Sequence, residues 1–159
     1  MKTRRLAAGL LVAAALAGCA ATGGGVRPGA TLDEVRAQWG EPKAMYQVET
    51  GQRLFYSPQP WQVQRLDFDA QGRLQQVHEQ MLTPALLSGI VAGQWRVADV
   101  QQAFGPPARR ADDAGKGSQW VYSYQEHGVF RLARIHFNTA GVVTSVVLGE
   151  DPAADSRYR

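Results

Sequence analysis

The chain of 159 residues has a single cysteine, Cys19, and little that points to chemistry. One cysteine cannot form an intramolecular disulfide, so the fold has to rest on packing. The apolar run from Leu6 to Ala17 is shorter than the ~20 residues that a membrane-spanning helix needs. A Gly-x-Ser-x-Gly elbow and a phosphate-binding glycine loop are lacking, and the three histidines, His78, His127 and His136, do not stand at metal-ligand spacing. We therefore expect no cofactor, no metal and no motif-borne active site.

The first 18 residues have the pattern of an export signal. Lys2, Arg4 and Arg5 form a positive region before the apolar run, and small residues follow it. Thr3-Arg4-Arg5-Leu6 contains an arginine pair, so the twin-arginine route and the general secretory route both stay open. We expect residues 1–18 to be a signal peptide.

The end of this signal, Leu16-Ala17-Gly18-Cys19, resembles the lipobox of bacterial lipoproteins. The resemblance implies that Cys19 becomes the first mature residue and carries a diacylglycerol and an acyl chain. Two or three acyl chains anchor a protein stably, whereas one would not. The next residue, Ala20, is not the aspartate that retains such proteins at the inner membrane, which implies the periplasmic face of the outer membrane. The alternative is an ordinary signal peptide with a chance cysteine.

The charge of the chain changes when the signal is removed. Residues 1–18 hold three of the 17 Lys and Arg residues and none of the 14 Asp and Glu, which leaves 14 of each sign. The mature chain is therefore neutral, and its charge gives no reason to expect binding to nucleic acid.

One segment of the sequence occurs twice. RLDFDAQGRLQQV, from Arg65 to Val77, returns as RIHFNTAGVVTSV, from Arg134 to Val146. In each copy, DAQG or NTAG supplies the turn residues of a β-hairpin. The stretch 67–72 also resembles the start of an EF-hand calcium loop, but His78 stands where a bidentate glutamate is needed, so we interpret it as a turn.

A helix is predicted before each copy. TLDEVRAQWGEP and RVADVQQAFGPP both place apolar residues on one helical face and end in a glycine cap followed by proline. After each helix we predict a three-stranded antiparallel meander, with the extra residues of the second copy in the loop ARRADDAGKGS. TPALLSGIVAG predicts a short helix between the copies. The expected organisation is a signal (1–18), a flexible lipid-anchored tether (19–30), two repeats (31–82 and 83–150) and a disordered tail (151–159).

These segments resemble a known family. VRPGATLDEVRAQWGEP, VAGQWRVADVQQAFGPP, WVYSY and the Phe-x-x-x-Gly hairpin are similar to the SmpA/OmlA lipoproteins, the family of BamE, although BamE has one copy and this chain two. Tandem copies of such a unit are similar in architecture to the β-lactamase inhibitory protein. The resemblance implies an α+β fold, a two-layer α/β sandwich of two tandem repeats (BamE/BLIP-like), in an envelope lipoprotein that binds proteins and does no chemistry.

The candidate binding surface is a sheet face that the helices leave uncovered. Strand alternation places Arg65, Asp67, Arg134 and His136 on this face, with Phe130 and Leu132 beside them in the second copy. The alternative is an ordinary solvated sheet face. Trp61, in the rigid stretch SPQPWQ, is expected to be an exposed aromatic anchor for a partner.

Three functions are compatible with these sequence features. The favoured one is a non-catalytic binding or scaffold protein on the outer membrane, whose partners are envelope or outer-membrane proteins. The second, by analogy with the tandem architecture, is an inhibitor of a periplasmic or secreted enzyme. The third is a small periplasmic hydrolase with His127 or His136 as its base. The sequence leaves the partner and the oligomeric state open.

Overall fold

The computed structural model describes residues 25–154, which form helices and antiparallel sheets. This confirms the predicted α+β class. The predicted signal peptide, Cys19 and residues 155–159 lie outside the described residues. Within the described part, none of the helices is both long enough and apolar enough to cross a membrane.

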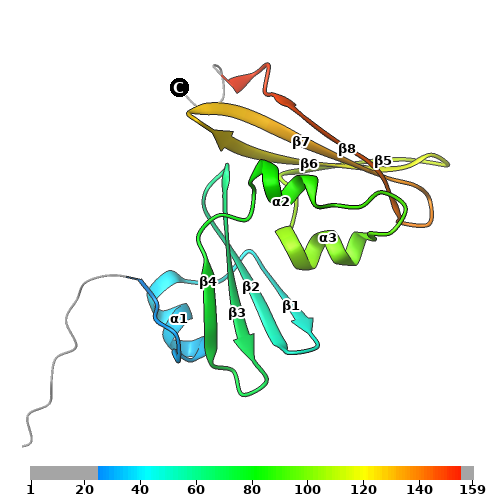
Figure 1. Ribbon diagram of the computed structural model, residues 1–159. Coiled ribbons are helices and arrows are strands. Elements are labelled where there is room, and N and C mark those ends of the chain that lie inside the picture. The colour runs from blue at the N-terminus through cyan, green and yellow to red at the C-terminus, as the bar shows by residue number, and fades with distance from the viewer. Residues whose placement is uncertain (1–24, 155–159) are drawn as a thin grey trace, which may run out of the picture.

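The first unit is a helix followed by a four-stranded antiparallel meander in which each strand pairs with the next. Figure 1 shows the helix, α1, against one face of this sheet. The elements are α1 (Leu32–Trp39), β1 (Ala44–Val48), β2 (Gly51–Gln59), β3 (Gln62–Asp69) and β4 (Leu74–His78).

The second unit repeats this order after a short extra helix. In Figure 1, α2 and α3 both lie on the side of the second sheet that faces the first unit. The elements are α2 (Pro84–Ser88), α3 (Val97–Phe104), β5 (Arg109–Asp113), β6 (Gly117–Glu126), β7 (Val129–Phe137) and β8 (Val143–Glu150).

The prediction of three strands per unit is wrong, because each sheet has four. The strands that were missed are β1 and β5, the first in each meander. All five residues of β5 are exposed, so the segment lacks the apolar alternation that reveals a strand, and we had assigned it to an inserted loop. Strand β1 is equally short and only half-buried on its inner face.

The helix α1 begins and ends where its sequence predicts. The Thr31 hydroxyl accepts a hydrogen bond from the Glu34 N–H at 3.2 Å, and the Thr31 N–H donates to the Glu34 carboxylate at 2.7 Å. The bond from the Thr31 N–H, and a further one that the Thr31 hydroxyl donates to the same carboxylate, lower the pKa of Glu34. At the other end, Gly40 has a φ of +79°, a left-handed conformation that favours glycine. The capping box therefore fixes the helix at its first residue.

A tyrosine joins sheet to helix at the same place in both units. The Tyr56 hydroxyl donates to the carbonyl of Gly40 at 3.0 Å, and the Tyr122 hydroxyl donates to that of Gly105 at 2.9 Å. Both carbonyls follow directly on the helix, where no intrahelical donor reaches them. Sheet and helix are thereby held at one relative position in each unit.

Replacing Tyr122 with phenylalanine is expected to lower the free energy of unfolding by about 1–3 kcal/mol, because the buried Gly105 carbonyl loses its donor. Burial also raises the pKa of Tyr122. Above pH ~10 the unfolded chain then ionises this tyrosine while the folded chain does not, so stability falls as pH rises. Urea unfolding at neutral and alkaline pH should show a smaller alkaline loss for the variant than for wild type. Tyr56→Phe, which removes the corresponding hydroxyl of the first unit, is the matched control. If wild type and Tyr122→Phe lose the same stability between neutral and alkaline pH, the role given to Tyr122 is contradicted.

The doubled hairpin turns are closed by the same side-chain bonds. Asp69 Oδ1 accepts hydrogen bonds from the N–H groups of Gln71 and Arg73. In the second unit, Asn138 Oδ1 accepts hydrogen bonds from the N–H groups of the residues at positions 140 and 142, which are two and four residues after it, as in the first turn. The Asp69 carboxylate thus serves its own turn, as expected of a hairpin.

The apolar side chains form two clusters of different size. The smaller one lies between α1 and one face of the first sheet, and consists of Val35, Leu54, Tyr56, Leu66, Phe68 and Leu74. The larger one fills the second unit but also includes residues of the first, namely Phe55, Val63, Met81 and Leu82. Neighbouring residues Leu54 and Phe55 therefore belong to different clusters, and the two units share the larger one.

The helix α3 contacts both sheets. Its Val100 and Phe104 pack into the second sheet, while its Gln102 carbonyl accepts a hydrogen bond from Arg53 of β2 at 3.0 Å. Directly after the helix, a Cβ on Gly105 would lie only 2.8 Å from the Phe55 ring, so the first sheet lies close against this helix end. The predicted two-layer sandwich therefore needs correction, because the first sheet has α1 on one face and is partly covered on the other by α3 and the larger cluster.

Both ends of the described chain are more ordered than we predicted. The Gly29 N–H donates to the Leu74 carbonyl and the Leu74 N–H to that of Ala30, although 19–30 was expected to be a flexible tether. The Asp151 N–H donates to the Phe130 carbonyl at 3.0 Å, inside the predicted tail. Backbone pairing with strand ends holds these segments, and composition does not reveal such pairing.

Candidate functional site at the junction of the two units

Arg65 and Asp67, two of the predicted site residues, lie in an ion cluster on the first sheet. Arg65 Nη2 is 2.9 Å from Asp67 Oδ2, and His78 Nε2 is 3.1 Å from the same oxygen. Arg53 Nε lies 3.2 Å from Asp67 Oδ1 without the alignment of a hydrogen bond. We call these four residues the Asp67 cluster.

The Asp67 cluster is not on an open surface. It lies on the face of the first sheet that carries Phe55, and Arg53 connects it to α3. The Arg65 side chain is only 14% exposed, and burial lowers its pKa while the charge of Asp67 opposes that shift. These side chains are therefore half-buried and not on a fully uncovered face as expected, because Arg53 beside them contacts α3 of the second unit.

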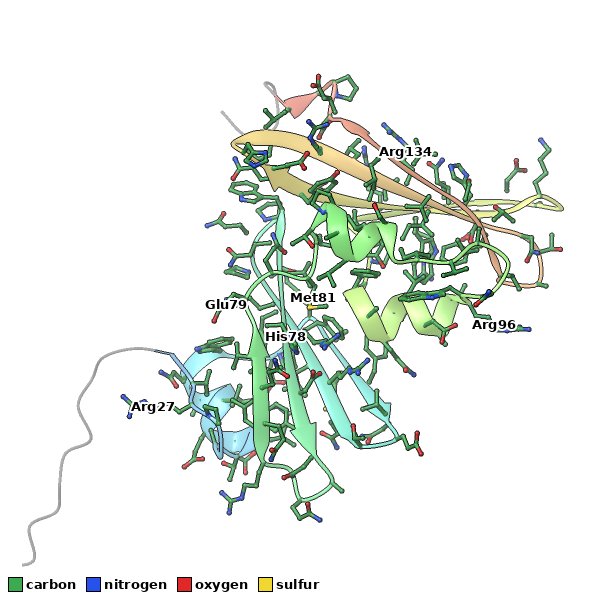
Figure 2. The ribbon with its side chains drawn as sticks, viewed as in Figure 1. Arg27, His78, Glu79, Met81, Arg96 and Arg134 are labelled. Atoms are coloured by element: carbon green, nitrogen blue, oxygen red, sulfur yellow. The ribbon has the colours of Figure 1, made fainter. Side chains whose placement is uncertain are left out.

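Arg134 and His136 lie on a different sheet, on β7. Their side chains alternate with the buried Ile135 and Phe137, which point into the larger cluster, so they face away from α3. Figure 2 shows Arg134 on the second sheet, far from His78 of the Asp67 cluster. The structure therefore does not unite the four predicted residues in one surface.

The predicted aromatic residues Trp61 and Phe130 pack against each other. Their ring centroids are 5.1 Å apart in an edge-to-face arrangement, which joins the β2–β3 turn of the first unit to β7 of the second. Both side chains are half-buried. Trp61 is thus a contact between the units, and it is half-buried where we expected an exposed anchor.

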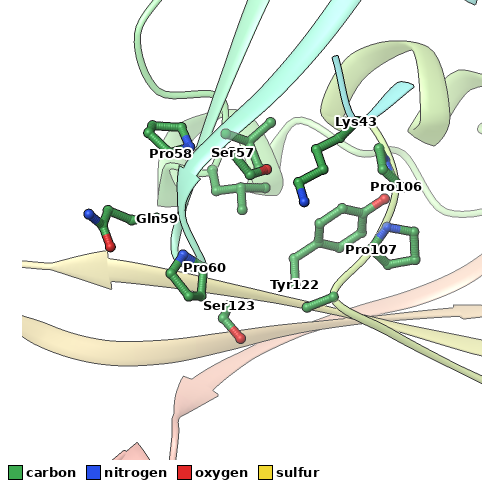
Figure 3. A pocket seen from close by; sticks show the side chains of 12 residues that line it. Lys43, Ser57, Pro58, Gln59, Pro60, Pro106, Pro107, Tyr122 and Ser123 are labelled. Atoms are coloured by element: carbon green, nitrogen blue, oxygen red, sulfur yellow. The ribbon is translucent and has the colours of Figure 1, made fainter. Parts of the chain in front are cut away.

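A cavity of about 400 Å³ opens between the units and is lined by residues of both. Figure 3 shows two pairs of prolines on opposite sides of it, with β6 of the second unit passing below. We call it the junction groove. It is lined by Lys43, Ser57, Pro58, Gln59, Pro60, Val63, Leu82, Pro106, Pro107, Ala108, Tyr122 and Ser123.

The strand β6 presents an unpaired edge in the junction groove. The two-residue turn His127-Gly128 joins Glu126 to Val129, which face each other across the two strands. In an antiparallel pair, the N–H and C=O groups of alternate residues point to the same neighbouring strand. Those of Glu126, and of every second residue back to Tyr122, therefore point to β7. Those of Ser123 point to the opposite edge. There β5 pairs only as far as Val121, and among residues 25–154 no hydrogen bond to the Ser123 backbone comes from that side.

Proline explains why the chain leaves this edge open. Continuing the register of Arg109 with Val121 would place Pro107 opposite Ser123. Proline has no N–H to donate to a sheet, so β5 cannot extend further. Ser123 is only 6% exposed, yet it lines the cavity with an N–H and a C=O that lack a backbone partner.

Sequence reasoning did not find the junction groove. Its lining comes from segments between positions 43 and 123, and packing alone brings them together. The stretches SPQP and GPP were visible signals, since prolines flank both walls.

Within residues 25–154 no three His, Cys, Asp or Glu side chains gather as they would around a metal ion. Comparison of the chain with protein-family models, with curated proteins and with solved structures finds no match.

Proposed function

We propose that the protein is a non-catalytic, lipid-anchored protein of the outer membrane that binds other envelope proteins at the junction of its two units. The two units are proposed to be tandem copies of the SmpA/OmlA type, arranged as in the β-lactamase inhibitory protein. The observation that carries the binding role is the junction groove, where an unpaired strand edge lies between apolar walls. Such an edge is a common means of recognising a protein segment.

The recurring contacts support the tandem part of this proposal. The helix-to-sheet tyrosine bond and the side-chain closure of the hairpin turn occur at corresponding positions of both units. The isolated bridges of Thr31 with Arg73 and of Arg96 with Val142 correspond in the same way. Units that match at this level and share a core form one body, with a junction that neither unit has alone.

The Asp67 cluster supports a binding role over a hydrolytic one. The single carboxylate is engaged by two arginines and by His78, and Arg53 also binds the carbonyl of Gln102. Charges paired in this way link β2, β3 and β4 to one another, and Arg53 links β2 to α3. The histidines of the hydrolase alternative lie elsewhere: His127 is in the β6–β7 turn, and His136 contacts Gln119 at 3.3 Å.

The test is capture of partners by the full chain, expressed with its own signal and crosslinked in intact cells before the envelope is solubilised. We expect to recover a defined envelope or outer-membrane protein, and added unlabelled chain should compete for this partner and reduce its recovery. Capture of a soluble enzyme, together with stoichiometric inhibition of that enzyme by the purified chain, would favour the inhibitor alternative. Recovery of the same proteins with an unrelated lipoprotein of equal abundance would contradict the proposal.

A further inference from the structure

The floor of the junction groove offers the two backbone groups that a β-strand uses for pairing. The Ser123 N–H and C=O point to the side where β5 has ended, and Tyr122 and Tyr124 on either side are already bonded to β7. Buried backbone groups are nearly always paired in folded proteins. A ligand in an extended conformation can supply both missing bonds at once.

The walls of the groove prevent the chain from filling it with its own backbone. Pro58 and Pro60 form one side and Pro106 and Pro107 the other, as Figure 3 shows. None of the four has an N–H to donate. Together with Val63 and Leu82 they give the groove apolar sides, which suit small apolar side chains of a ligand.

Charge complementarity selects the ligand further. Lys43 is the one charged residue that lines the groove, and Figure 3 shows its side chain pointing into the space between the prolines. In residues 25–154 no ion pair of Lys43 is present. The ammonium group therefore has its donors available for a carboxylate of the ligand.

We propose that the junction groove binds an extended, apolar peptide segment of a partner protein, with its backbone paired to Ser123 and an acidic side chain bound to Lys43. This inference rests on the proposed function and names the kind of partner segment. The cavity of about 400 Å³ holds only a short stretch, so a few residues of the segment make the contact.

The probe is the blocked peptide acetyl-Thr-Val-Glu-Val-Thr-amide, in which glutamate is the only carboxylate, titrated into the purified full chain. Amide NMR should show the Ser123 N–H exchanging fast in the free protein, unlike those of Tyr122 and Tyr124, and becoming protected on binding. Replacing the peptide's glutamate with glutamine should weaken binding about tenfold, the value of one charge-assisted contact. A peptide with glutamine in place of glutamate and a free carboxyl terminus, if it binds as well, would overturn the assignment to a side chain.

Two matched pairs control this experiment. Lys43→Glu should weaken binding at least about tenfold, whereas Lys116→Glu, the same change of charge in the exposed β5–β6 turn, should leave it unchanged. Two peptides that are N-methylated on alternate sets of amides should also differ in affinity, because one set of amides faces Ser123 and the other faces away. Equal effects of the two lysine variants, equal binding of the two methylated peptides, or an unprotected Ser123 amide would each overturn the inference. Partner capture that survives Lys43→Glu would overturn this inference but not the proposed function, which requires only that partners bind at the junction of the units.

Discussion

Replacing Phe55 with alanine is expected to lower the free energy of unfolding by about 3–5 kcal/mol, the usual range for a buried phenylalanine. Phe55 is a strand residue of the first unit, fully buried in the cluster that fills the second. It packs edge-on against Tyr46 at 5.7 Å and lies against the backbone at Gly105. The cavity left by alanine would therefore open between the units.

The shared cluster also determines how the protein unfolds. Because the units share one cluster, the chain should unfold in a single transition, reported alike by the fluorescence of variants that keep only Trp39 in the first unit or only Trp120 in the second. Val63→Ala, a smaller change in the same cluster, is the graded control. Two separate transitions in wild type, or a Phe55→Ala loss below about 1 kcal/mol, would contradict the shared core.

Replacing Cys19 with serine is expected to move nearly all of the protein from the membrane pellet to the soluble fraction. Without the thiol no diacylglycerol can be attached, and the run from Leu6 to Ala17 is too short to hold the chain as a spanning helix. Fractionation of cells on a sucrose gradient measures the change.

Ala20→Asp is the matched control for this variant. It leaves the proposed lipid attachment at Cys19 intact but introduces the residue that retains bacterial lipoproteins at the inner membrane, so the protein is expected to move to the inner membrane and stay sedimentable. Cys19→Ser protein that remains in the outer-membrane fraction would contradict lipid anchoring.

The sequence predicted those parts of the fold that local chemistry fixes. Thr31 with Glu34 and the glycines after each helix set the helix ends, and the Asp69 and Asn138 turns set the long hairpins. These features depend on residues within a few positions of one another. Strand β5 escaped prediction because all its side chains are exposed, so burial leaves no periodic trace.

The candidate site was less predictable, because it depends on packing between the units. Strand alternation correctly separated the two faces of β3, but it could not show that α3 would lie beside the face that carries Arg65 and Asp67 and bind Arg53. Trp61 likewise contacts Phe130, which lies far from it in the sequence. The unpaired edge in the junction groove arises because Pro107 stops β5 at the pair with Val121, two residues before Ser123, and this requires the register of β5 with β6.

Site-specific photocrosslinking in cells shows whether partners bind at the junction of the units. A photoreactive amino acid would replace Pro58 on the groove wall, or Ala114 in the exposed β5–β6 turn as the control. We predict a discrete crosslinked product from position 58, absent from position 114 and lost when Lys43→Glu is added. The same products from both positions, or none from position 58 while the wild-type chain still captures its partner, would contradict the account.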